Sequence, residues 1–228
     1  MLSKVTKVQI FFCLSGIFVI FLFFLFTFIV RADVFTSFDF DTTHRIQNIT
    51  PLRIDPFFSF LSVIGRFEYT IVFLIVILAL LYRKVVGGII MFCLFGFAHI
   101  LELIGKTILD HPGPPSMFLR SQYSEFPGLH VYTDASYPSG HSMRSVVLSI
   151  LLIYWIYQTK HLHAIIKAVF IGGIIGLIGL MLYSRVSLGE HWTTDVVGGS
   201  ILGLGIALLS LTFLKKETAK KNKDQENI

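Results

Sequence analysis

The chain has 228 residues, of which 54% are hydrophobic and only 14% are charged. This balance excludes an ordinary soluble domain and is typical of a membrane protein. The two cysteines, Cys13 and Cys93, lie inside apolar runs, which excludes a disulfide framework and a cysteine-based zinc site. The net charge of +5 does not indicate nucleic-acid binding, because five lysines are concentrated in the last fourteen residues, as in a tail at a membrane surface.

Six apolar runs along the chain are predicted to be membrane-spanning helices. The first run, Val8 to Val30, is long enough for an uncleaved span and too long for the apolar core of a signal peptide. The other runs cover residues 67–82, 85–109, 141–157, 164–183 and 194–214. The sequence therefore predicts an all-α integral-membrane bundle of six transmembrane helices, in one domain of residues 1–214, followed by a charged cytoplasmic tail of residues 215–228.

Two connections and two pairs of glycines complete the predicted architecture. Residues 31–66 are polar, and within them residues 51–64 are expected to form a short interfacial helix. Residues 110–140 are rich in proline and are expected to form a structured loop at the membrane surface, where such loops shape entrances for substrates. The pairs Gly172/Gly176 and Gly199/Gly203 have the small-xxx-small spacing that predicts close packing of helices.

The distribution of basic residues predicts an orientation. With six spans, the amino end, the turns near residues 83 and 160 and the carboxyl tail share one side, and that side holds Lys4, Lys7, Arg83, Lys84 and Lys160 besides the tail lysines. Basic loops favour the cytoplasm, so both termini are predicted to be cytoplasmic and the opposite end extracytoplasmic. Four arginines between residues 31 and 66 count against this orientation.

The first polar motif is Tyr137-Pro-Ser-Gly-His141, which stands immediately before an apolar run. The amides of Ser139 and Gly140 are therefore expected at a helix N-terminus, where unpaired N–H groups favour an anion. Gly140 would let that anion approach the backbone closely. His141, at the same place, fits a general acid that protonates a leaving oxygen.

The second motif is Ser184-Arg185, followed after five residues by His191 and after three more by Asp195. His191 and Asp195 are four apart and share one face of a helix, so the carboxylate can keep one ring nitrogen protonated while the other attacks as a nucleophile. Arg185 would clamp phosphoryl oxygens. Together the two motifs predict a site that handles phosphate.

The order of these motifs, about forty residues apart, resembles the type 2 phosphatidic acid phosphatase (PAP2) superfamily over residues 85–212. The resemblance implies that His191 is a phosphohistidine nucleophile, that Asp195 orients it and that His141 is the acid. It also implies a set of phosphate-binding residues, namely Lys106, Ser139, Gly140 and Arg185. A metal site made of His141, His191 and Asp195 is the alternative, but Lys106 and Arg185 would repel a cation, so neither a metal nor another cofactor is expected.

The third predicted span carries a polar stripe of His99, Glu102 and Lys106, spaced three and four residues apart. Ionisable residues inside a span usually face the bundle interior or a functional site. The alternative is that Glu102 only neutralises Lys106 as an ion pair along the helix.

The chain departs from the family at its first motif, Lys-x6-Arg-Pro. Lys106 and Pro114 match that motif, but Gly113 stands in place of the arginine, which should weaken the grip on phosphate. Three residues are candidates to replace it, His111, Arg120 and Arg144. We favour Arg144 as a further phosphate-binding residue, because it follows His141 by one helical turn; the alternative is that Arg144 extends to the membrane interface.

The resemblance implies a membrane phosphatase that acts on a lipid phosphate or diphosphate, such as polyprenyl diphosphate, phosphatidylglycerol phosphate or phosphatidic acid. Phosphotransfer from His191 to a lipid or sugar acceptor uses the same chemistry and is one alternative. The other is a lipid-binding membrane protein that lost turnover with the missing arginine, although the presence of all three catalytic-type residues argues against it. The expected partners are the lipid substrate and the bilayer.

Overall fold

The computed structural model describes residues 6–81, 85–120 and 135–213, and within them it is helical apart from connections and one isolated antiparallel bridge between Pro112 and Ala135. The elements in chain order are α1 (Lys7–Arg31), α2 (Thr36–Ile49), η1 (Leu52–Ile54), α3 (Asp55–Ile64), α4 (Phe67–Leu81), α5 (Val85–Ile108), η2 (Ser116–Phe118), α6 (Gly140–Gln158), α7 (Ala164–Ser187) and α8 (Thr193–Leu211). The all-α prediction is confirmed for the described residues. The predicted charged tail, residues 215–228, lies outside them.

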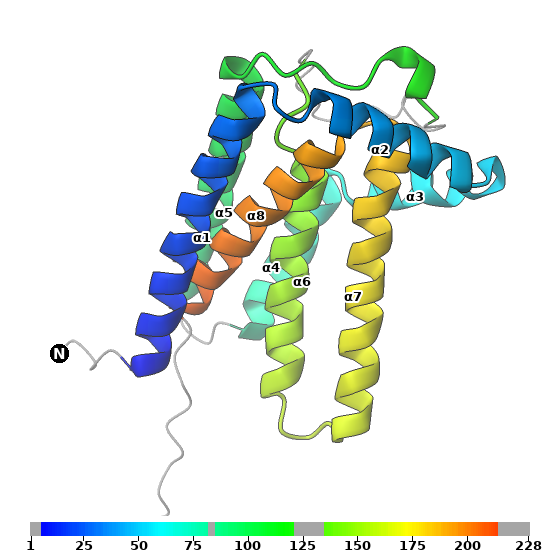
Figure 1. The fold of residues 1–228 in the computed structure, drawn as a ribbon. Coiled ribbons are helices and arrows are strands. Elements are labelled where there is room, and N and C mark those ends of the chain that lie inside the picture. Colours follow the sequence, from blue (N-terminus) through cyan, green and yellow to red (C-terminus); the bar gives the residue numbers. More distant parts are fainter. Residues whose placement is uncertain (1–5, 82–84, 121–134, 214–228) are drawn as a thin grey trace, which may run out of the picture.

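The helices α1 and α4 to α8 run side by side, and α2 and α3 lie across one end of them (Figure 1). α8 is the central helix and packs against α1 and α6, whereas α7 packs mainly on α6 along the side of the bundle. Buried residues make up 67% of the apolar stretch of α8 and only 6% of that of α7. α8 therefore forms the core, and most of α7 faces outward.

Small residues on α8 allow this central packing. A Cβ atom at Gly199 would lie 2.2 Å from the carbonyl oxygen of Ser139, and one at Gly203 would lie 2.5 Å from that of Met143. The predicted packing role of this glycine pair is confirmed. The same prediction for Gly172 and Gly176 on α7 is wrong within the described chain, because a Cβ atom at either glycine would meet nothing there within 4 Å.

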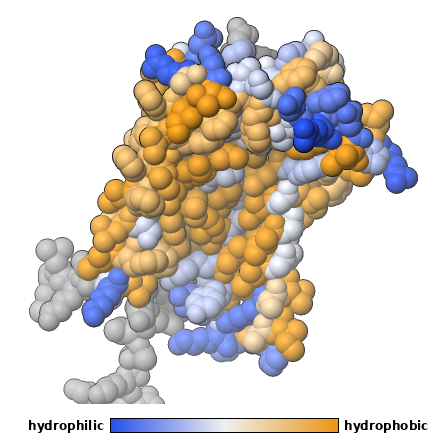
Figure 2. All heavy atoms as spheres, in the orientation of Figure 1, coloured by the Kyte–Doolittle hydropathy of each residue, from blue (hydrophilic) through white to orange (hydrophobic). Residues whose placement is uncertain are grey.

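Four helices are long and apolar enough to cross a membrane, at Lys7–Arg31, Gly87–Ile108, Ala164–Ser187 and Thr193–Leu211. A fifth candidate is the pair Leu52–Ile64 and Phe67–Leu81, which is bent by 59° at its break. The predicted count of six spans is therefore not confirmed: α6, whose first two turns carry polar motif residues, is not among the candidates. Hydrophobic side chains cover the flank of the bundle in Figure 2 and hydrophilic ones gather at its two ends, as expected of an integral membrane protein.

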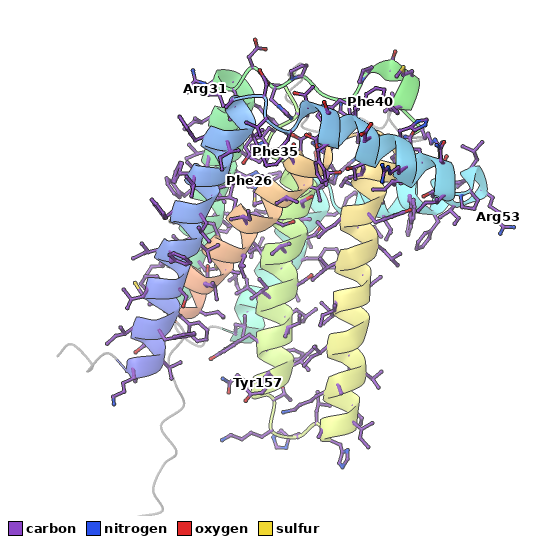
Figure 3. The ribbon with its side chains drawn as sticks, in the orientation of Figure 1. Phe26, Arg31, Phe35, Phe40, Arg53 and Tyr157 are labelled. Carbon is purple, nitrogen blue, oxygen red and sulfur yellow. The ribbon has the colours of Figure 1, made fainter. Side chains whose placement is uncertain are left out.

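The layer across the end of the bundle differs in part from the prediction. α3 is the short helix expected within residues 51–64, but α2 lies in what was predicted to be a polar connection. Aromatic contacts pack α2 against α1 and η2. The ring centroids of Phe26 and Phe35 are 5.8 Å apart, and those of Phe40 and Phe118 are 5.3 Å apart (Figure 3). The buried side chains of α2 are polar, so apolar periodicity does not reveal this helix.

The opposite end of the bundle gathers the start of α1, the turn between α6 and α7 and the end of α8 (Figure 1). Of the basic residues behind the predicted orientation, Lys7 and Lys160 lie at this end, and Lys4, Arg83, Lys84 and the tail lysines lie outside the described residues. Both polar motifs lie at the end that α2 and α3 cover. Which end faces the cytoplasm stays a prediction.

Candidate active site

The N-terminus of α6 and the N-terminus of α8 meet at the covered end of the bundle. Ser139 is the N-cap residue of α6, and its Oγ accepts a hydrogen bond from the amide of Ser142 at 3.4 Å. The amide of Ser139 donates to the backbone carbonyl of Asp195 at 3.0 Å. This backbone contact joins the two sequence motifs directly, and it leaves Gly140 as the first helical residue at the junction.

His191 and Asp195 pair as predicted, but not along one helix face, because α8 begins at Thr193 and His191 lies before it. Nδ1 of His191 lies 3.4 Å from Oδ2 of Asp195, and the amide of Trp192 donates to the same oxygen at 2.8 Å. The Asp195 side chain is completely buried. Because Nδ1 is turned toward the carboxylate, Nε2 is the ring nitrogen on the side away from Asp195.

A second imidazole reaches the same carboxylate. Nε2 of His111 lies 3.3 Å from Oδ1 of Asp195, on the side away from His191. Burial by itself lowers the pKa of His111, but its contact with Asp195 and the nearby charge of Asp39 outweigh burial, so the pKa is raised above its usual 6.5. His111 therefore does not take the place of the missing arginine, because it lies against the carboxylate.

Arg185 is fully buried and surrounded by acceptors from three segments. Its guanidinium donates to Ser62 Oγ and to the Glu190 carboxylate, each at 2.5 Å, and to Ser184 Oγ at 2.9 Å. A carboxylate and two hydroxyls thus hold this predicted phosphate-binding group in place.

His141 faces the break between α3 and α4. Its Nε2 lies 3.1 Å from the carbonyl oxygen of Ser62, and a Cβ atom at Gly65 would lie 2.8 Å from its Cδ2. A carbonyl oxygen only accepts hydrogen bonds, so Nε2 is the nitrogen that carries the proton here. The end of α3 therefore forms a wall of the site and sets the tautomer of His141.

Lys106, Glu102 and Arg144 form a charged cluster beside the start of α6. The carboxylate of Glu102 lies 2.9 Å from Lys106 Nζ, 3.4 Å from a terminal nitrogen of Arg144 and 3.1 Å from Nδ1 of His99. The predicted ion pair between Glu102 and Lys106 is present, and Glu102 also pairs with Arg144. A Cβ atom at Gly140 would lie 2.0 Å from Oε1 of Glu102, so this carboxylate touches the predicted anion site itself.

The three candidates to replace the missing arginine have different partners in the structure. The Arg144 side chain is 7% exposed and its Nε donates to the carbonyl of Gly65 at 3.2 Å, so it does not extend to the interface. Arg120 instead donates to the carbonyl of Thr50 at 3.4 Å. Of the three, Arg144 is the one that lies in the charged cluster beside His141.

Four residues of this site were not predicted from the sequence: Ser62, Gly65, Glu190 and Asp39. Glu190 adjoins His191 in the chain, and that position next to a motif was a signal that could have marked it. Asp39 accepts from the amide of Thr194 at 2.9 Å and from its hydroxyl at 2.6 Å, so α2 caps the N-terminus of α8. No sequence pattern pointed to Ser62 or to Asp39.

The family profile of the PAP2 superfamily matches residues 87–219, which is more than half of the chain. The chain belongs to the PAP2 superfamily. One relative, phosphatidylglycerophosphatase B of Bacillus subtilis (strain 168), is 33% identical over 140 residues, which cover 59% of this chain and 62% of the relative. The match thus spans less than two thirds of that relative. Undecaprenyl-diphosphatase of Sulfolobus acidocaldarius is 31% identical over 162 residues, 71% of each chain.

The fold is also that of a solved PAP2 protein. The crystal structure of a transmembrane PAP2-type phosphatidylglycerolphosphate phosphatase from Bacillus subtilis superposes with a TM-score of 0.68, covering 87% of this chain and 94% of the other. The two sequences are 22% identical, so this likeness bears on the fold alone. It agrees with a PAP2-type helical bundle whose motifs meet at one end.

Proposed function

We propose that this PAP2 protein hydrolyses a lipid phosphate or diphosphate through a phosphohistidine formed on His191. The observation that carries the proposal is the pairing of His191 Nδ1 with the buried Asp195 carboxylate at 3.4 Å. This pairing leaves Nε2 as the nucleophilic nitrogen, at the end of a membrane bundle where His141 and Arg185 also lie.

The reaction has two in-line steps. Nε2 of His191 attacks phosphorus, the bond from phosphorus to the lipid oxygen breaks, and His141, protonated on both ring nitrogens at this stage, gives one proton to that oxygen and becomes neutral. Water then attacks the phosphohistidine, the phosphorus–nitrogen bond breaks, and His141 takes the proton of the water. The Gly140 amide at the start of α6 would bind a phosphoryl oxygen, whereas the predicted donor at Ser139 already gives its N–H to the carbonyl of Asp195.

Two cationic side chains complete the proposed phosphate site. Arg185 and Lys106 each pair with a carboxylate of this chain, Arg185 with Glu190 and Lys106 with Glu102. A substrate phosphate would share or replace these partners, since each cation can bind more than one anion. Arg144, which also contacts Glu102, would add the positive charge that Gly113 lacks.

The names of the relatives support lipid substrates for this chain as well. A phosphatidylglycerol phosphate and a polyprenyl diphosphate share a phosphate group on an apolar tail, and such a tail could reach the site from the bilayer between helices. The basic segments favour cytoplasmic termini, which would make the site open on the extracytoplasmic side. Phosphotransfer to a lipid or sugar acceptor remains the alternative, because His191 would carry the phosphoryl group in either reaction.

Phosphate release by the purified protein in detergent tests the proposal, with a panel of lipid phosphates and diphosphates and with His191→Ala and His44→Ala as paired variants. His44 lies exposed on α2, so its variant controls for loss of a histidine. We expect release by the wild type and His44→Ala and none by His191→Ala. A phosphorylated acceptor in place of free phosphate would indicate a transferase, and binding without turnover would indicate a lipid-binding protein.

A metal-free reaction is a separate part of the proposal. The cations beside the histidines would disfavour a bound metal ion. EDTA should leave phosphate release unchanged, and vanadate should inhibit it, because vanadate resembles the five-coordinate phosphoryl transition state. Loss of activity in EDTA that magnesium restores would refute this part and leave the lipid phosphatase activity standing.

A further inference from the structure

We propose that His111 is a positioning residue for this reaction: it holds the second carboxylate oxygen of Asp195 and, by gaining or losing a proton, sets how strongly Asp195 supports His191. The inference rests on the proposed function. It concerns the imidazole of His111, which is not a fixed position of the PAP2 motifs. His111 lies in the same loop as Gly113, two residues before the position of the missing arginine.

The two carboxylate oxygens of Asp195 have different neighbours. Its Oδ2 receives the amide of Trp192 at 2.8 Å and faces Nδ1 of His191 at 3.4 Å. Its Oδ1 faces Nε2 of His111 at 3.3 Å, and among the described residues this is the side chain recorded within ion-pair distance of that oxygen. A fully buried carboxylate is costly without a polar or positive neighbour, so removal of His111 would leave Oδ1 without this contact.

The loop that carries His111 is hydrogen-bonded to residues at both motifs. The amide of Ser136 donates to the carbonyl of His111 at 3.0 Å, and the indole nitrogen of Trp192 donates to the carbonyl of Pro112 at 2.8 Å. The His111 ring also meets the ring of Tyr137 edge-on at 6.1 Å. Trp192 thus holds Asp195 through its backbone and the His111 loop through its side chain, which keeps the imidazole against the carboxylate.

The charges around His111 favour its protonated form. Three carboxylates favour its positive charge: Asp195 from α8, which is in contact, and Asp39 from α2 and Asp33 from the connection before α2, which act through their charge. Nearby titratable groups include Asp110 in the same loop, Tyr137 and, across Asp195, His191. Burial lowers the pKa of His111, but the carboxylates outweigh burial and raise it. The protonated form of His111 is therefore stabilised relative to that of a free histidine.

That charge acts on His191 through the shared carboxylate. A neutral His111 places Nε2 against Oδ1 and only aligns Asp195. A protonated His111 also attracts the negative charge of Asp195, so the carboxylate supports the Nδ1 hydrogen of His191 less, and Nε2 of His191 becomes a weaker nucleophile. The rate of phosphohistidine formation should therefore rise with pH as His111 loses its proton.

Two substitutions separate the two effects. His111→Ala removes the donor, and His111→Gln keeps an amide donor near the position of Nε2 but cannot be protonated. With full-length protein in detergent, a lipid phosphate substrate and kcat and KM measured between about pH 5 and about pH 9, His111→Ala should lower kcat about ten- to a hundredfold with KM changed less than about twofold. His111→Gln should keep most of kcat at high pH and lose one ionisation from the acid limb.

His44→Gln is the matched control, since that histidine is exposed on α2 and has no role in the proposed site. A purely structural role for His111 would lower the melting temperature and the yield of both variants and leave the shape of the pH profile unchanged. That result would overturn the proposal, as would wild-type values of kcat for both variants.

A readout without turnover distinguishes failure of this inference from failure of the proposed function. The imidazole of His111 can be titrated by NMR in the wild type and in Asp195→Asn. If Asp195 holds His111, the pKa of His111 falls in Asp195→Asn, whether or not the protein releases phosphate. An unchanged pKa would overturn the pairing, and a protein that shows the fall in pKa but releases no phosphate would overturn the proposed function alone.

Discussion

The carboxylate of Glu102 lies against the backbone of Gly140, the first residue of α6, so closely that a Cβ atom there would be 2.0 Å from Oε1. The helix start that the sequence predicts as an anion site is therefore next to an anion of the protein itself. Lys106 and Arg144, two predicted phosphate-binding residues, contact the same carboxylate. A substrate phosphate in this place must share these cations with Glu102 or displace it.

Glu102→Gln should destabilise the protein and make it more responsive to added anions. Arg144 is buried, and removing one partner of a buried charge pair costs about 3–5 kcal/mol. Vanadate could then supply the missing charge. Thermal unfolding in detergent should show a lower melting temperature than wild type and a larger rise on adding vanadate.

Asp41→Asn, at an exposed position on α2, is the control for loss of a carboxylate and should leave the melting temperature near that of the wild type. An equal vanadate response in Glu102→Gln and wild type would show that Glu102 does not occupy the anion site.

His191→Ala and His141→Ala should differ in their dependence on the leaving group. Without His191 there is no covalent path for any substrate, whereas a leaving group of low pKa needs no proton from His141. Steady-state rates with an activated aryl phosphate and with a lipid phosphate would test this. His141→Ala should retain much more activity on the aryl phosphate, and equal losses on both substrates would remove His141 as the general acid.

Arg144→Ala should lower the rate about thirty- to a thousandfold, the effect of losing roughly 2–4 kcal/mol of transition-state stabilisation. Gly113→Arg should restore part of that loss, and the site has room for it, because a Cβ atom at Gly113 would lie 3.5 Å from Cβ of Ser136, an ordinary contact. The measurement is a double-variant cycle on one lipid substrate.

Arg144→Lys keeps the charge and is the matched variant, so it should lose less activity than Arg144→Ala. Near-normal turnover by Arg144→Ala would make Arg144 a structural partner of Glu102 and Gly65 and leave the missing arginine without a replacement.

The pairing of His111 should also give the protein a pH-dependent stability. A histidine whose pKa is raised in the folded state stabilises the fold fully below its unfolded pKa, near 6.5, and this contribution is lost as pH rises through the folded pKa. The melting temperature of the wild type should therefore fall more steeply above pH 6.5 than that of His111→Gln. Parallel curves for the two proteins would contradict the raised pKa.

The sequence by itself determined the all-helical membrane architecture and the identity of the paired His191 and Asp195. The architecture follows from a local rule, because long apolar runs form helices in a bilayer. The pair was predicted from a shared helix face, but α8 begins at Thr193, so His191 lies before the helix and meets Asp195 across its first turn. The N-cap at Ser139 is likewise local, since Ser142 is the residue whose amide it accepts. Such features depend on neighbours in the chain, which is why a single sequence reveals them.

Only the tertiary structure decided which distant residues complete the site. Glu102 and Arg144 are 42 residues apart, and Ser62 and Arg185 are 123 apart, yet each pair is in contact. A buried charge takes whichever partners the neighbouring elements present, and helical periodicity says nothing about which element lies opposite. For this reason His111, one of three candidates to replace the missing arginine, lies against Asp195 instead, and α2, which was expected as a connection, caps α8 through Asp39.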